Sequence, residues 1–141
     1  GLGDVYKRQV LFDGEMPLRE ALSGAILDAP RASTPLQTLL RAFLVVTVPR
    51  QEADREMSMA RRRVIAASPA LRERDLAKAD RVTAALSAAL VSRGIDPSVA
   101  RLAAEVAMVM WTQALDAWFT DPTTPLETHL IDKFDAFQKL T

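Results

Sequence analysis

Apolar residues recur every three or four positions along most of this chain, and prolines preceded by Ser, Thr or Asp divide the pattern into segments. This spacing is that of one buried face of an α-helix. Proline suits the first turn of a helix, and a Ser, Thr or Asp before it can cap the free N–H groups. The chain is therefore predicted to be all-α, a bundle of about six helices at about 16–28, 35–48, 50–66, 69–93, 97–120 and 125–140.

Four helix starts carry capping signals. Thr34 is followed by Pro, Leu and Gln37, and Thr124 by Pro, Leu and Glu127. Both sequences predict a capping box, in which the third residue's side chain binds back to the backbone of the cap. The other predicted caps are Ser68 and Asp96, with a helix end at Gly94 and a loop over 28–34.

The predicted helix at 97–120 is apolar on nearly every side. Between Leu102 and Phe119 its strongly polar residues are Glu105, Thr112, Gln113 and Asp116. A helix of this kind must be covered over most of its surface, which one small bundle can hardly do alone. Buried polar groups such as Thr112 and Gln113 would then need partners from a ligand or from a second subunit.

The last helix adds a second apolar stripe, formed by Leu126, Leu130, Phe134 and Phe137 and widened by Ile131 and Leu140. We interpret the last two helices as the subunit interface of a homodimer. The predicted interface residues are Val106, Gln113, Leu130, Phe134 and Phe137. The alternative is that both helices only complete an intramolecular core, because the two patterns look the same in one sequence.

Composition narrows the class of protein. The 141 residues are 49% hydrophobic and 6% aromatic, include five glycines and no cysteine, and carry no formal net charge. A chain of this length forms one domain with a sizeable core, without disulfides or thiolate metal sites. Domains that grip nucleic acid usually have a basic excess, so this one is not expected to read DNA itself. No apolar run reaches the about 18 residues of a membrane span and no secretory signal is visible, so we expect a cytoplasmic protein.

The first nine residues, GLGDVYKRQ, match the in-frame translation of a sequencing-library adapter. Segments of this kind are excluded from fold reasoning. We therefore expect residues 1–9 to be a non-native leader, with no role for Tyr6; the alternative is a genuine N-terminal arm. Since the chain has no initiator Met, the native protein is expected to extend further upstream.

No set of residues predicts an enzyme, a metal site or a bound cofactor. His129 is the single histidine, and there is no cysteine to complete a zinc site with it. Arg61, Arg62 and Arg63 form the strongest basic cluster, but consecutive helical residues point about 100° apart and cannot form one patch. Most of this cluster is expected to be solvated. The functional alternative is that one of the three, with Arg62 as the first candidate, points inward and anchors an anionic effector.

Between Arg61 and Phe119 an Arg-rich turn is followed by the helix start SPALR, a long helix, the turn RGIDP and the helix end ALDAW. This arrangement resembles the C-terminal domain of TetR-family transcriptional regulators, particularly the type represented by the mycofactocin-system regulator. VLFD at 10–13 is similar to the tail of the helix that follows the helix-turn-helix in that family. The similarity extends diffusely over 10–140 and contains no invariant catalytic or binding signature.

The resemblance implies a homodimer in which the last two helices of each subunit form a four-helix bundle, with an effector cavity among the middle helices. Residues 10–31 would be the remnant of a connecting helix, and 32–141 the ligand-binding and dimerisation domain. Operator DNA would be bound only by an N-terminal helix-turn-helix domain that is missing here. The predicted function is therefore effector binding and dimerisation in a one-component repressor; the alternative is a structural helical dimerisation module without a ligand.

A small apolar effector is expected, because methionine and aromatic side chains suit variable apolar ligands. Such side chains lie on the helices that the resemblance places around the cavity. The candidate ligand contacts are Phe43, Met57, Arg62, Met108, Trp111 and Leu115. Core packing is the alternative for each apolar member of this set.

Overall fold

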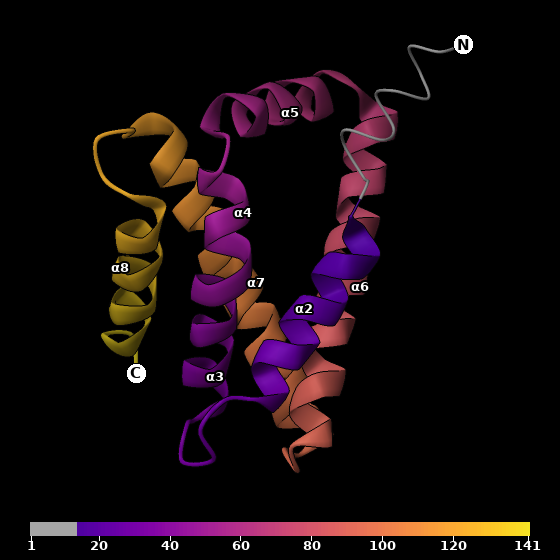
Figure 1. Cartoon of the computed structure of the whole chain (residues 1–141), viewed down its shortest axis with the longest axis vertical. Helices are drawn as coiled ribbons and strands as arrows, with labels where there is room; N and C mark the ends of the chain where they lie inside the picture. Colours follow the sequence, from indigo (N-terminus) through magenta and orange to yellow (C-terminus); the bar gives the residue numbers. More distant parts are fainter. Residues whose placement is uncertain (1–13) are drawn as a thin grey trace.

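The structure, a computed structural model, describes residues 14–141, and in this range it is helical without any strand. The predictions for residues 1–13, namely the leader and the VLFD segment, lie outside the described residues. The all-α bundle is confirmed (Figure 1). Its elements are α2 (Glu15–Leu27), α3 (Pro35–Ala42), the π-helix η1 (Phe43–Thr47), α4 (Val48–Glu52), α5 (Arg55–Ala67), α6 (Pro69–Ser92), α7 (Pro97–Thr120) and α8 (Leu126–Gln138).

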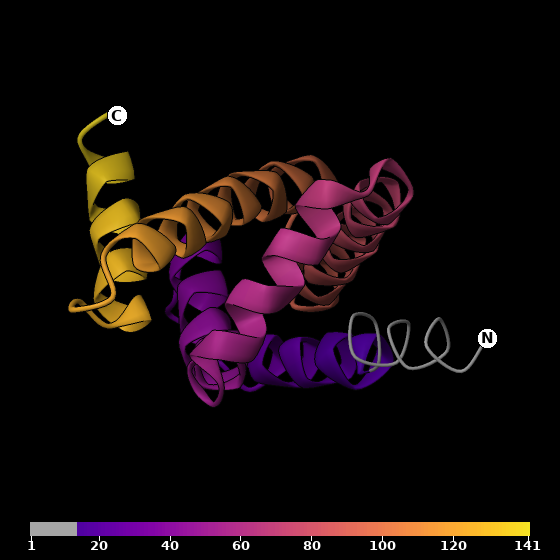
Figure 2. The same ribbon diagram turned by 90° about the horizontal axis from the view of Figure 1, so that it is seen from above.

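The two longest helices, α6 and α7, are antiparallel and pack on each other, with α7 in the middle of the molecule and α6 at one side (Figure 1). Helix α2 packs on α6, the rod made of α3, η1 and α4 packs on α2 and α7, and α8 packs on α7. Helix α5 crosses from the end of α4 to the start of α6, as the view from above shows (Figure 2). No helix in the range 14–141 is both long and apolar enough to cross a membrane.

The core lies where these helices meet. Helix α2 contributes two fully buried side chains, Leu22 and Ile26, and α8 contributes Leu126 and Leu130. Helix α7 faces the core largely with alanines, which allow its neighbours to approach closely. The buried alanines of α7 are Ala100, Ala103, Ala104, Ala107 and Ala114. Helix α2 therefore belongs to the same core as the rest of the bundle.

The predicted helix boundary between 48 and 50 is wrong. Helices α3 and α4 form one continuous rod with η1 between them, and the rod passes through Pro49. Proline has no N–H, and its ring clashes with the carbonyl four residues earlier in a regular α-helix. The wider π-turn accommodates it, since the Val48 N–H donates to the Phe43 carbonyl five residues back. The break falls instead at Ala53, after which Asp54 caps α5 by accepting from the Met57 N–H at 3.0 Å.

Three of the four predicted helix caps are confirmed. Thr34 and Gln37 form the reciprocal capping box, with distances of 3.2 and 2.9 Å. Ser68 accepts from the backbone of α6, and Asp96 from the backbone of α7. The turn between these two helices ends at Gly94, whose φ of +94° lies in the left-handed region that favours glycine.

The predicted capping box at the start of α8 is wrong. The Thr124 hydroxyl donates instead to Asp121 Oδ2 at 2.7 Å, in the turn that leaves α7. The Leu126 N–H at the start of α8 donates to Glu52 Oε1 of α4 at 2.9 Å. A carboxylate from a different helix therefore caps α8 and ties it to the end of the rod.

Replacing Glu52 with Ala is expected to destabilise the chain by about 1 kcal/mol, the usual cost of removing a helix cap. The same change at Glu127, which the sequence placed in the capping box, is expected to cost only a few tenths of a kcal/mol, since it removes just a charge near the positive helix end. Urea unfolding of both variants and the parent gives the comparison. Equal losses for the two variants would show that Glu52 does not cap α8.

Both ends of α2 are attached to α6. Near its start, Glu15 accepts two hydrogen bonds from Arg81, of 2.8 and 2.7 Å, and these bonds lower the pKa of Glu15 below its usual range. At its end, Arg93 donates to the carbonyl oxygens of Ile26, Ala29 and Pro30 at 2.9, 2.7 and 2.9 Å. One guanidinium thus satisfies several carbonyls that the end of a helix leaves free.

Candidate functional site: a cavity beneath α5

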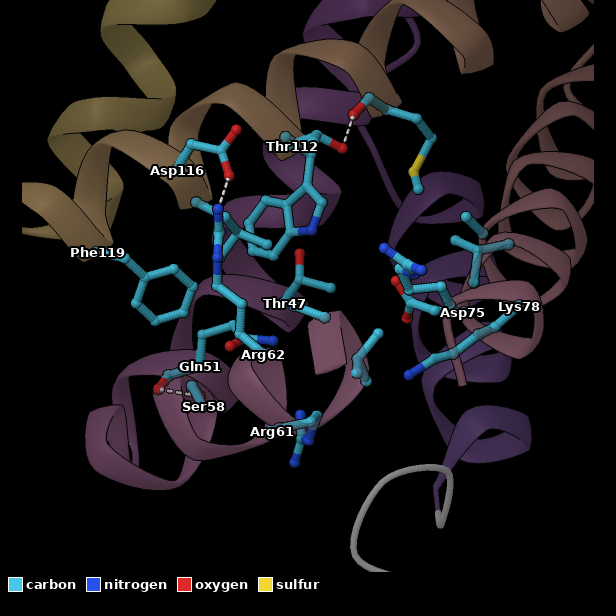
Figure 3. A pocket seen from close by; sticks show the side chains of 18 of the residues that line it. Thr47, Gln51, Ser58, Arg61, Arg62, Asp75, Lys78, Thr112, Asp116 and Phe119 are labelled. Carbon is cyan, nitrogen blue, oxygen red and sulfur yellow. Dashed lines mark hydrogen bonds and ion pairs between the residues drawn. The ribbon is translucent and has the colours of Figure 1, made fainter. Parts of the chain in front are cut away.

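A cavity of about 440 Å³ lies between α5, α6 and α7 and reaches α2 and α4 (Figure 3). Its volume falls in the range of small-molecule sites. The rest of the bundle positions α5 above it. Arg55 at the start of α5 donates to the Trp118 and Phe119 carbonyls at the end of α7, both at 3.4 Å, and its guanidinium lies 5.5 Å from the Trp118 ring centre.

Helix α7 supplies an apolar wall of the cavity. Met108, Trp111, Leu115 and Phe119 line it, and their spacing of three and four residues puts them on one face of the helix. The Trp111 ring is 9% exposed and stacks on Phe43, with ring centres 5.5 Å apart. Phe43 does not line the cavity but lies behind Trp111 and supports it.

The residues predicted to contact a ligand separate into three groups. Met108, Trp111, Leu115 and Arg62 line the cavity, Phe43 lies one layer behind it, and Met57 is 40% exposed and does not line it. Met57 is in the first turn of α5, where the chain has just left the rod and the helix turns this side chain towards solvent. The ligand-binding role of the four lining residues stays a prediction.

Arg62 points into the cavity region but is already paired. Its guanidinium donates to Asp116 of α7 and lies 5.0 Å from the centre of the Phe119 ring (Figure 3). About half of each partner's side chain is exposed, so the ion pair adds little stability. Arg62 therefore closes one side of the cavity instead of offering a free charge there.

A second group of cations lies on the α5 and α6 side of the cavity and was missed from the sequence. Arg61 of α5 and Arg72 and Lys78 of α6 line this side, together with the carboxylate of Asp75. Burial lowers the pKa of Lys78, and the positive charge of Arg61 lowers it further. The sequence signal was present in α5, where Ser58, Arg61, Arg62 and Ile65 share one helical face, but it does not tell which arginine lacks an acidic partner.

For Thr112 and Gln113 of α7 the sequence predicts partners from a ligand or a second subunit, and this stays a prediction. Thr112 lines the cavity and Gln113 lies beside it on the helix, yet both are exposed. The Thr112 hydroxyl donates to the Met108 carbonyl of its own helix at 3.0 Å. Within the described part of the chain, Thr112 thus needs no ligand to satisfy its hydroxyl.

The predicted interface residues differ in how deeply the single chain buries them. Leu130 and Phe134 are 0% and 5% exposed and belong to the core of the single chain. Val106 and Phe137 are half-buried, and Gln113 is exposed. Their role in a dimer stays a prediction, but Leu130 and Phe134 have little surface left for a partner.

No chemistry beyond binding is evident at His129. Its Nε2 lies 3.3 Å from the Asp121 carbonyl oxygen and 3.9 Å from the Asp121 carboxylate. Among residues 14–141, no three or more His, Asp or Glu side chains come together in a way that could hold a metal ion. The hydrogen-bonded turn residues Thr123 and Thr124 lower the pKa of Asp121.

No protein-family model matches this chain, and no curated protein matches it in sequence.

Proposed function

We propose that this chain is the effector-binding and dimerisation domain of a one-component transcriptional repressor resembling the TetR family. The observation that carries the proposal is the cavity, because its walls come from five different helical segments and include the first described helix, α2. A binding site built from that many elements can alter their packing when it is filled. The DNA-binding helix-turn-helix domain would be joined ahead of α2.

Helix α2 would transmit the signal. Leu18 lines the cavity, three residues after Glu15 and its bonds to Arg81. A ligand that fits better when this part of α2 is displaced would shift the population towards that arrangement, and a ligand indifferent to the displacement would shift nothing. The movement would reorient two DNA-reading domains relative to successive major grooves.

A second copy of the chain would cover the outer face of α7. Val99, Leu102, Val106 and Val109 follow one another at intervals of three and four residues, and three of them are 49%, 63% and 57% exposed. Only Val106 of the four is half-buried. Apolar stripes of this kind mark helix–helix interfaces, and a two-fold axis would pair the stripe with itself.

Val109→Glu is expected to weaken self-association at least tenfold, because two-fold symmetry places the new charge in the interface twice. Val45→Glu on η1 is the matched control, since Val45 is 56% exposed against 57% for Val109 but is not part of the α7 stripe. Sedimentation over a range of concentrations measures both. A parent chain that stays monomeric would refute the dimer, and equal effects of the two changes would refute the interface.

The DNA upstream of this coding region tests the regulator itself. The intact gene is expected to encode a helix-turn-helix of roughly 50 residues ahead of α2, a segment that a purely structural dimerisation module does not need. An intact gene without such a segment would refute the repressor proposal. Ligand binding in the cavity is an independent test, because an effector-binding domain binds a ligand there and a purely structural dimerisation module does not.

A further inference from the structure

The two sides of the cavity differ in chemistry. The α7 side is largely apolar, with Met108, Trp111 and Leu115. Figure 3 shows Arg61 and Lys78 on the other side of the cavity, away from Thr112 and Asp116, with the Lys78 side chain extending into the space. A ligand that matches both sides would be apolar along one part and charged or polar at one end.

The positive charges on the α5 and α6 side exceed the negative ones. Of the four cations that line the cavity, Arg62 is paired with Asp116. The remaining three, Arg61, Arg72 and Lys78, share one lining carboxylate, that of Asp75. The carboxylate of Glu15 also lies near Lys78, but it already accepts two hydrogen bonds from Arg81 and lies 3.6 Å from Arg19.

The side chains of Arg61 and Lys78 both lack full compensation: one has a donor without an acceptor, and the other lies near a second positive charge. The Arg61 Nε atom is buried and, like the Nε atoms of Arg19 and Arg55, has no hydrogen-bond partner among the described residues; of these three arginines only Arg61 lines the cavity. Buried donors of this kind are rare in proteins, and each calls for an explanation such as a missing ligand. The lowered pKa of Lys78 reflects burial beside another cation. An anion between the two side chains would accept hydrogen bonds from the Arg61 guanidinium and the Lys78 ammonium and compensate both charges.

From this arrangement we propose that the cavity binds an amphipathic anion, whose carboxylate or phosphate lies between Arg61 and Lys78 and whose apolar chain lies along Met108, Trp111 and Leu115. The inference rests on the proposed effector-binding function and names the chemical class of the effector. An arginine fork suits either head group, because both offer two oxygens to two parallel N–H donors. The volume of about 440 Å³ suits a small ligand with one apolar chain.

Three probes with the same decyl chain test the proposal by calorimetric titration at neutral pH: undecanoate, decyl phosphate and decan-1-ol. At least one of the two anions is expected to bind about tenfold more tightly than the alcohol, or better, since hydrogen bonds to charged groups are the stronger ones. The comparison between undecanoate and decyl phosphate tells which head group the site prefers.

Arg61→Gln and Lys78→Met are each expected to remove most of the preference for the anions over decan-1-ol. Arg63→Gln is the matched control, because Arg63 is an exposed arginine of the same helix that does not line the cavity. Thermal unfolding followed by circular dichroism verifies that each variant is folded. Since the two test variants lie on different helices, a folding defect in one leaves the other as a test.

The outcomes separate this proposal from the function on which it rests. If the alcohol binds as tightly as both anions, or if Arg61→Gln and Lys78→Met behave like Arg63→Gln, the anion site is refuted while the cavity remains an effector site. If none of the three probes binds, the anion proposal is refuted and the effector-binding function loses its support as well.

Discussion

Phe134→Glu is expected to unfold the chain, or to lower its free energy of unfolding by more than about 3 kcal/mol. Phe134 is 5% exposed on α8 and belongs to the same core cluster as the buried residues of α2, α6 and α7. The change removes a large apolar ring and puts an ionisable carboxyl among apolar neighbours. Both effects act in the same direction, so the loss exceeds that of most single substitutions.

Denaturant unfolding and sedimentation of Phe134→Glu together decide where this side chain acts. Gln138→Glu is the control, because it introduces the same carboxylate on an exposed position of α8 and should leave stability unchanged. A variant that is folded as stably as the parent but monomeric would contradict the core position and place Phe134 in the subunit interface, as the sequence predicted.

Trp111→Ala is expected to cost about 3 kcal/mol of stability, because a large buried ring is removed and its surroundings relax only in part. The change also removes the stacking contact with Phe43 and widens the cavity next to it. Trp111→Phe keeps an aromatic ring at this position and should cost less than about 1.5 kcal/mol.

Urea unfolding of the two Trp111 variants tests this ranking, and titration with decan-1-ol reports on the cavity wall. We expect the alanine variant to self-associate to the same extent as the parent, since Trp111 faces the cavity and not the outer stripe of α7. Equal stability of the parent and both variants would show that Trp111 is not part of the core, and an alanine variant that fell apart into folded monomers would reverse the two faces of α7.

The sequence predicted a helix start correctly where the capping residue lies directly before the helix. Thr34, Ser68 and Asp96 cap the helices that begin next to them, so the sequence around each was sufficient. The start of α8 could not be predicted in this way, because its cap, Glu52, is 74 positions away in the chain. The helix end predicted at Pro49 was wrong for a related reason. The π-turn before Pro49 lets the helix continue through it, and no sequence rule distinguishes such a turn from a helix end.

The candidate site was predictable to the extent that one helix defines it. Met108, Trp111 and Leu115 share a face of α7 by spacing alone, and all three line the cavity. The choice between Arg61 and Arg62 depends on another helix, because Asp116 of α7 pairs with Arg62 and leaves Arg61 without an acidic partner among the described residues. Which arginine is paired depends on contacts between helices, and these contacts cannot be read from a single sequence.

Arg93 binds the segment after α2 through main-chain oxygens, and it uses no side chain of that segment. Every residue type has a carbonyl, so the exposed residues Leu27 and Pro30 can change during evolution without removing an acceptor from Arg93. Arg93 itself has no such freedom. A lysine offers one nitrogen on a flexible stem, whereas the guanidinium spreads its donors over a fixed plane. The sequence of the loop after α2 is therefore free to vary, whereas the contacts to its carbonyls require an arginine at position 93.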